Sequence, residues 1–208
     1  MLQSRSIIAN AFFEFFFLAL LSLAAPLLVA VDVIIIGHEV PEASVTEFTQ
    51  EALLFLSGLL FALIAWRHED QRGFYTLAAG FFGCMLIREM DSWFDLISNG
   101  FWLWPALFVA AASIACTMIF WRDTVVQPLT DFIDTKPYFF VIFGLIIVLV
   151  FSRTFGSGEL LWKHVGEYNS GWKTMIQEGL ELFGYIYIAY GSSLLFRHKK
   201  LERRKVSL

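Results

Sequence analysis

The sequence predicts an all-α, polytopic integral membrane protein, a bundle of six transmembrane helices with its N-terminus and C-terminus in the cytoplasm. The chain has 208 residues, of which 58% are hydrophobic and only 16% are charged, whereas an ordinary soluble domain carries roughly 25% charged residues. Residues 12–31 contain a single charge, Glu14. So few polar side chains are not enough to cover the surface of a water-soluble globule. This composition therefore excludes a soluble enzyme, a disulfide scaffold and a disordered tail.

Six stretches are apolar over about the 20 residues that a helix needs to cross the hydrocarbon core. They lie at about residues 7–30, 45–66, 73–93, 101–121, 137–153 and 174–196. We therefore expect one transmembrane domain over residues 1–208, with a basic cytoplasmic tail at 197–208.

The first two stretches have clear boundaries. The first is far longer than the roughly 7–15 apolar residues of a signal peptide, so we interpret it as a membrane helix. Ser44 and Glu47 form a capping-box pattern, in which the serine accepts from the helix start and the glutamate reaches back. This pattern predicts that the second helix starts near Val45.

The second, fourth and sixth helices end alike, in an aromatic residue followed by arginine. The pairs are Trp66-Arg67, Trp121-Arg122 and Phe196-Arg197. An aromatic ring beside a long basic side chain is typical of the membrane interface. The fifth helix, between Pro137 and Ser152, has no ionisable side chain except Tyr138, and we expect it to face lipid.

The distribution of basic residues predicts the orientation. With the N-terminus inside, eleven of the fifteen Lys and Arg residues fall on the cytoplasmic side, in agreement with the positive-inside rule. The other four are Arg88, Arg153, Lys163 and Lys173. We expect a multi-pass protein of the cell membrane, specifically a bacterial inner membrane.

Small residues at four-residue spacing predict where helices approach each other closely. The pairs are Gly58 and Ala62, Ala79 and Gly83, and Ala106 and Ala110. They indicate close packing of helices two, three and four, and we assign them no catalytic or binding role.

Ionisable residues inside the spans form one layer near the outer side. Glu51, Arg88 and Glu181 each lie 15 residues from the inner end of their helix, which is about 22 Å at a rise of 1.5 Å per residue. Glu89 and Glu178 lie close to the same level. A charge within a span costs about 2.5–3.5 kcal/mol on insertion scales, so these groups should face the bundle interior.

Within helix three, Arg88, Asp91 and Asp95 should share one helix face, and Arg88 is expected to hold two carboxylates. The predicted buried polar cluster consists of Glu51, Arg88, Glu89, Asp91, Glu178 and Glu181. Its surplus of acid favours proton retention by one carboxyl group, or recruitment of a cation. One interpretation of this cluster is a site for a proton, a cation or a metal, or the polar end of a substrate cavity. The other is a structural ion-pair cluster around Arg88 that fixes the register of the helices.

A divalent metal is a candidate cofactor, because carboxylate and imidazole ligands suit zinc and non-haem iron. The candidate ligands are Glu89, Glu178, Glu181, His164 and His38. Neither histidine belongs to an HExxH or HxxxH motif, so interfacial hydrogen bonding is the alternative role for both.

Glu14 stands alone on the first helix, about 13 Å above Arg5. No base is expected at its depth unless Arg197 or Arg72 reaches it. It is either protonated or part of an inner polar pocket, and we consider it a candidate inner proton station.

Three functions remain open from the sequence alone. The first is a small proton- or cation-linked transporter or ligand-binding membrane protein that uses the acidic layer. The second is an accessory or assembly subunit that pairs with another membrane protein. The third is a membrane-embedded enzyme, metal-dependent in one version, that acts on a lipid or isoprenoid.

The expected partners follow from charge and hydropathy. The lipid bilayer surrounds the bundle, and anionic lipid is a candidate partner of the C-terminal tail. Nucleic acid is not expected, because the basic residues form no stripe with interleaved aromatic residues.

Overall fold

The protein is all-helical over the residues that its computed structural model describes, which are 2–36, 44–157, 162–164 and 170–206; no strand occurs in these segments. The long helices are α1 (Leu2–Val31), α2 (Val45–Arg67), α3 (Arg72–Glu89), α5 (Leu103–Phe120), α7 (Lys136–Ile146) and α9 (Ser170–Val206). The short ones are α4 (Asp91–Asp95), α6 (Val126–Ile133) and α8 (Arg153–Phe155), with π-helical turns η1 (Asp32–Ile36) and η4 (Ile147–Ser152) and 3-10 turns η2 (Glu69–Gln71), η3 (Arg122–Thr124) and η5 (Trp162–His164).

Within the described residues, four helical segments are long and apolar enough to cross a membrane. They are Ile8–Ile35, Val45–Arg67, Leu103–Phe120 and Lys136–Phe155. The chain therefore has the character of an integral membrane protein. The other two expected spans form the helices α3 and α9, which are more polar; α3 carries Arg72, Arg88 and Glu89 within its 18 residues.

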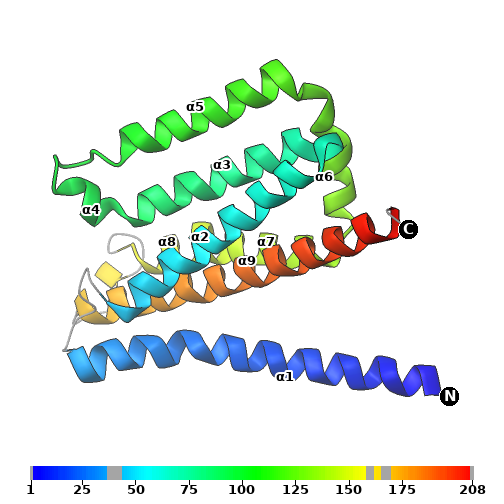
Figure 1. Ribbon diagram of the computed structural model, residues 1–208. Coiled ribbons are helices and arrows are strands. Elements are labelled where there is room, and N and C mark those ends of the chain that lie inside the picture. The colour runs from blue at the N-terminus through cyan, green and yellow to red at the C-terminus, as the bar shows by residue number, and fades with distance from the viewer. Residues whose placement is uncertain (1, 37–43, 158–161, 165–169, 207–208) are drawn as a thin grey trace.

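The long helices run between two ends of the molecule (Figure 1). At one end, called the α4 end here, lie α4 and the starts of α2 and α9. At the other, the α6 end, α6 crosses the bundle and both chain termini are found. Helices α2 and α9 lie in the middle, with α3 and α5 on one side and α1 on the other.

The core is aromatic near the α6 end. Phe61 of α2 stacks on Phe82 of α3 with ring centroids 5.2 Å apart, and Phe132 of α6 meets Phe61 edge-on at 6.2 Å. Phe132 is the buried anchor of α6, whereas Val126 and Leu129 of the same helix are exposed. An amphipathic helix lying across a bundle end is typical of an interfacial element.

Asp32 fixes the start of α2 across the α1–α2 connection. Its carboxylate accepts hydrogen bonds from the backbone N–H groups of Val45 at 2.9 Å and Thr46 at 2.8 Å, and from the Thr46 hydroxyl. The N-cap Ser44 adds a bond from the Glu47 N–H at 3.0 Å, which confirms the predicted start. A buried acid is favourable here because the first N–H groups of a helix lack partners and carry partial positive charge.

The predicted boundaries differ from the structure at two helices that shape the site. Helix three was expected to continue to residue 93, but α3 ends at Glu89 and Asp91 begins the separate helix α4. The predicted helix 137–153 exists, but its regular part ends at Ile146 and the π-helical turn η4 carries the chain to Ser152.

The fifth helix was expected to face lipid, but only one side of α7 is exposed. Phe139 and Phe143 are exposed, but Val141 and Gly144 are buried against α9. A Cβ atom on Gly144 would lie 2.5 Å from the carbonyl oxygen of Gly184. Glycine therefore permits close contact of α7 and α9, away from the small-residue pairs that the sequence suggested.

Candidate cation site

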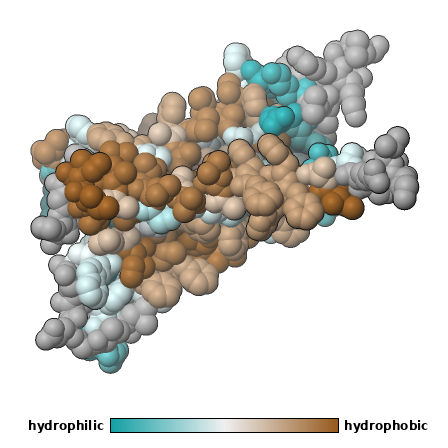
Figure 2. Space-filling model, turned by 90° about the horizontal axis from the view of Figure 1, so that it is seen from below, coloured by the Kyte–Doolittle hydropathy of each residue, from teal (hydrophilic) through white to brown (hydrophobic). Residues whose placement is uncertain are grey.

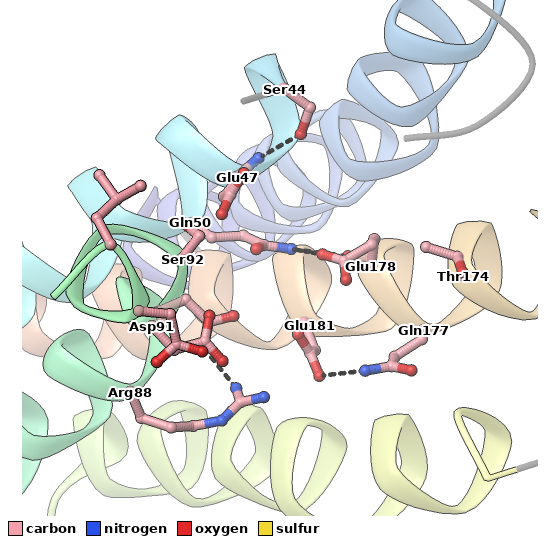
Figure 3. A pocket seen from close by; sticks show the side chains of 13 residues that line it. Ser44, Glu47, Gln50, Arg88, Asp91, Ser92, Thr174, Gln177, Glu178 and Glu181 are labelled. Atoms are coloured by element: carbon pink, nitrogen blue, oxygen red, sulfur yellow. Dashed lines mark hydrogen bonds and ion pairs between the residues drawn. The ribbon is translucent and has the colours of Figure 1, made fainter. Parts of the chain in front are cut away.

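A polar cavity of about 550 Å³ opens at the α4 end, between α2, α3, α4 and α9 (Figure 3). Six acids and one arginine are among the side chains that line it. The lining residues are Ser44, Glu47, Gln50, Arg88, Glu89, Asp91, Ser92, Asp95, Leu96, Thr174, Gln177, Glu178 and Glu181. Most of the ionisable residues that were predicted to form one layer therefore line this cavity.

Glu89 is held at the end of α3 by two donors. The Arg88 guanidinium donates to its Oε2 atom at 2.7 Å, and the Tyr185 hydroxyl of α9 donates to the same oxygen at 3.0 Å. Arg88 was expected to hold Asp91 and Asp95 along one helix face, but the face is interrupted because α3 ends one residue after Arg88. The ion pair of Arg88 is with its neighbour Glu89 instead.

Glu181 is the most enclosed acid of the site, with 2% of its side chain exposed. Its Oε1 atom accepts from the Ser152 hydroxyl at 2.6 Å and from the Gln177 amide at 3.3 Å, and pairs with Arg153 at 3.2 Å. Ser152 and Arg153 lie where η4 passes into α8. A π-helical turn changes which side chains face a neighbouring helix, and here Ser152 faces Glu181 of α9.

Glu178 contacts α2 through Gln50. The Gln50 amide nitrogen donates to Glu178 Oε2 at 3.0 Å and to the Glu178 backbone carbonyl at 3.1 Å. The amide oxygen of Gln50 is buried and accepts no hydrogen bond from any residue that the structure describes. A buried amide oxygen without a donor costs free energy unless water or a ligand supplies one.

The charges around the cavity do not balance. Arg88 and Arg153 each compensate one acid, Glu89 and Glu181. Glu178 accepts a hydrogen bond from a neutral amide, that of Gln50, and Asp91 and Asp95 also line the space. The cavity is therefore strongly acidic and complementary to a cation.

The structure brings together most of the predicted cluster. Arg88, Glu89, Asp91, Glu178 and Glu181 all line the cavity. Glu51 does not; its Oε1 atom is buried without a hydrogen bond from the described residues, and its neighbour Gln50 occupies the cavity side of α2 instead.

Sequence reasoning missed several polar residues of the site. They are Gln50, Ser152, Arg153, Gln177 and Tyr185. Tyr185 lies one turn after Glu181 on the same helix face, which is a signal that the sequence contains. Ser152 carries no such signal, because its direction depends on the π-helical turn.

Of the candidate metal ligands, Glu89, Glu178 and Glu181 line the cavity. His164 is exposed in the η5 turn and does not line the cavity, and His38 lies outside the described residues. Over the described segments, no three His, Cys, Asp or Glu side chains are arranged to hold one ion. The divalent metal stays a prediction.

Glu14 has a partner that the sequence did not reveal. Lys136, at the start of α7, pairs with its carboxylate at 2.5 Å. Both residues line a second cavity, of about 920 Å³, toward the α6 end. Glu14 therefore lies at a cavity together with a base, and its role as an inner proton station stays a prediction.

Comparisons with protein-family models, with curated proteins and with solved structures give no match for this chain.

Proposed function

We propose that the six long helical segments all cross the bilayer, with the α6 end in the cytoplasm and the α4 end on the opposite side. Both termini lie at the α6 end, as an even number of crossings requires. Helix α3, with 18 residues, is about 27 Å long, close to the roughly 30 Å hydrocarbon core. Its charges Arg88 and Glu89 face the cavity, so they need not contact lipid.

We propose that the acidic cavity binds a small cationic ligand, and that the protein acts as a proton- or cation-linked transporter or as a ligand-binding membrane protein. The observation that carries this proposal is the imbalance of the lining, which has six acids and one arginine around about 550 Å³. Glu89 and Glu181 are buried, and the crowding of further carboxylates around the same cavity favours a counter-charge, either protons or a bound cation.

The contacts favour an organic amine over a bare metal ion. Glu89, Glu178 and Glu181 are each held by separate donors, which keeps their oxygens from converging on one point. An ammonium group has several N–H donors, so it can reach the open Gln50 oxygen and a carboxylate together. A chain with more than one amine suits carboxylates that are spread around a wide cavity.

Equilibrium binding of spermidine to the purified protein in lipid nanodiscs tests this proposal. We expect saturable binding to the unchanged protein and about tenfold weaker binding to Glu178→Gln, because one charge-assisted contact is lost. Asp123→Asn is the matched control, since Asp123 is 95% exposed in its side chain and lies near the α6 end. Equal binding by Glu178→Gln and the unchanged protein would contradict the proposal.

The accessory-subunit and enzyme hypotheses also stay open, and other measurements separate them. A constant second membrane protein in mild-detergent purifications would favour the accessory role. Stoichiometric metal in the purified protein would favour the metal-dependent enzyme. Residence in the cell membrane of a bacterium stays a prediction that localisation of the expressed protein checks.

A further inference from the structure

The second cavity, of about 920 Å³, has the shape and chemistry of an amphiphile site. It lies between α1, α2 and α9, and most of its wall is apolar. The apolar lining residues are Phe13, Phe17, Leu21, Leu53, Leu56, Ile186, Ala189 and Leu194. The polar ones are Asn10, Glu14, Lys136, Tyr190, Ser193 and Arg197.

The polar groups gather at one end of this cavity. Along α9 the lining runs from Arg197 to Ile186, eleven residues or about 16 Å. One leaflet of the hydrocarbon core is about 15 Å thick. With the α6 end at the cytoplasmic surface, as proposed above, the cavity extends from the bases at that end to about the middle of the bilayer.

The base at its mouth is available for an anion. Lys136 pairs with Glu14, but Arg197 is exposed and makes no ion pair with the side chains that the structure describes. One acid and two bases give the mouth a charge of +1 (−1 for Glu14, +2 for Lys136 and Arg197). Guanidinium groups bind phosphate oxygens in pairs.

The outer wall of the cavity is the N-terminal helix. Figure 2 shows the face that α1 covers: apolar side chains occupy most of its length, and hydrophilic ones gather beside the end where the termini lie. Phe13 and Phe17 of α1 line the cavity and remain 73% and 38% exposed, so this wall is accessible from the surface of the bundle.

We propose that this cavity, with the membrane orientation proposed above, binds one anionic phospholipid of the cytoplasmic leaflet, with an acyl chain between α1, α2 and α9 and its phosphate at Arg197, beside the pair of Lys136 and Glu14. The site is separate from the acidic cavity and shares no lining residue with it. It differs from simple attraction of the basic tail to a surface, because it requires both the headgroup charge and an inserted chain.

Native mass spectrometry of the detergent-purified protein with added phosphatidylglycerol or phosphatidylcholine tests the proposal. We expect one phosphatidylglycerol to be retained preferentially, and Arg197→Gln to weaken that retention by about tenfold. Arg197→Lys should keep most of it. Arg122→Gln is the matched control, because Arg122 is a base near the same end that does not line the cavity.

Three results would overturn the lipid site. They are equal retention of the two lipids, an effect of Arg122→Gln as large as that of Arg197→Gln, and displacement of the lipid by inorganic phosphate alone. Spermidine binding to Arg197→Gln is measured in parallel; because it depends on the other cavity, it should be unchanged whichever way the lipid experiment ends.

Discussion

At the residue scale, the most distinctive feature of this largely apolar chain is the position of a few polar side chains. Glu181 and Glu89 are almost completely buried, and each has both a cationic and a hydroxyl partner. The level of Arg88, Glu89 and Glu181 was predictable from the sequence, because helix rise alone gives their depth. Their partners were not, since the direction of Ser152 and Arg153 depends on the turn η4.

Spermidine binding should strengthen as the pH rises between about pH 5 and pH 8. Protons and the amine compete for the same carboxylates, so a lower pH fills the site with protons and removes its charge. Titration of the binding constant against pH checks this. A binding constant independent of pH over that range would show that carboxylates do not bind the ligand.

Asp32→Ala should lower stability by about 1–3 kcal/mol, because the N–H groups of Val45 and Thr46 would lose their acceptor and that of Thr46 is buried. Asp32→Asn should lower it less, since the amide oxygen still accepts one bond. Thermal unfolding in detergent measures both, with Asp123→Ala as the exposed control. Equal unfolding midpoints for Asp32→Ala and the control would show that Asp32 does not stabilise the start of α2.

At the scale of elements, the sequence was most informative about helix existence and least about helix contacts. The capping pattern predicted the start of α2 correctly, because the Ser44 signal is local. The break between α3 and α4 was missed, because residues 73–93 contain neither proline nor a glycine near that point. The small-residue pairs located the approach of α2 and α3, where a Cβ on Gly58 would lie 3.9 Å from Ala79 and Gly83. They did not locate the contact of Gly144 with Gly184, which depends on how α7 and α9 are arranged.

Gly144→Ala should destabilise the protein by about 1–3 kcal/mol, because the added Cβ would lie 2.5 Å from the Gly184 carbonyl and 2.7 Å from Ile188 and would force α7 and α9 apart. Gly179→Ala is the control, because its Cβ would meet its nearest atom at 3.8 Å. Thermal unfolding of the two variants compares them. If both midpoints are equal, the close contact has no energetic role.

At the scale of the whole molecule, the two cavities lie toward opposite ends of the bundle and have opposite chemistry. The acidic one is at the α4 end and the basic mouth of the apolar one is toward the α6 end. This distribution of charge between the two ends agrees with the positive-inside distribution predicted from the sequence. The agreement requires that the two ends of the bundle lie on different sides of the membrane.

Labelling with a membrane-impermeant maleimide tests that arrangement. In a chain with Cys84 and Cys116 replaced by alanine, Asn99→Cys at the α4 end should react in intact cells, whereas Asp123→Cys near the α6 end should react only after permeabilisation. The two residues flank the same helix, α5, so each is the control of the other. Reaction of both in intact cells would contradict a crossing of α5.

The central claim is that the acidic cavity holds a cation, and an experimental structure of the protein at saturating spermidine tests it most directly. We predict elongated density in the cavity, with one amine between the Gln50 amide oxygen and the Glu178 carboxylate. A saturated protein whose cavity contains only water, or whose amine lies at another surface, would contradict the claim.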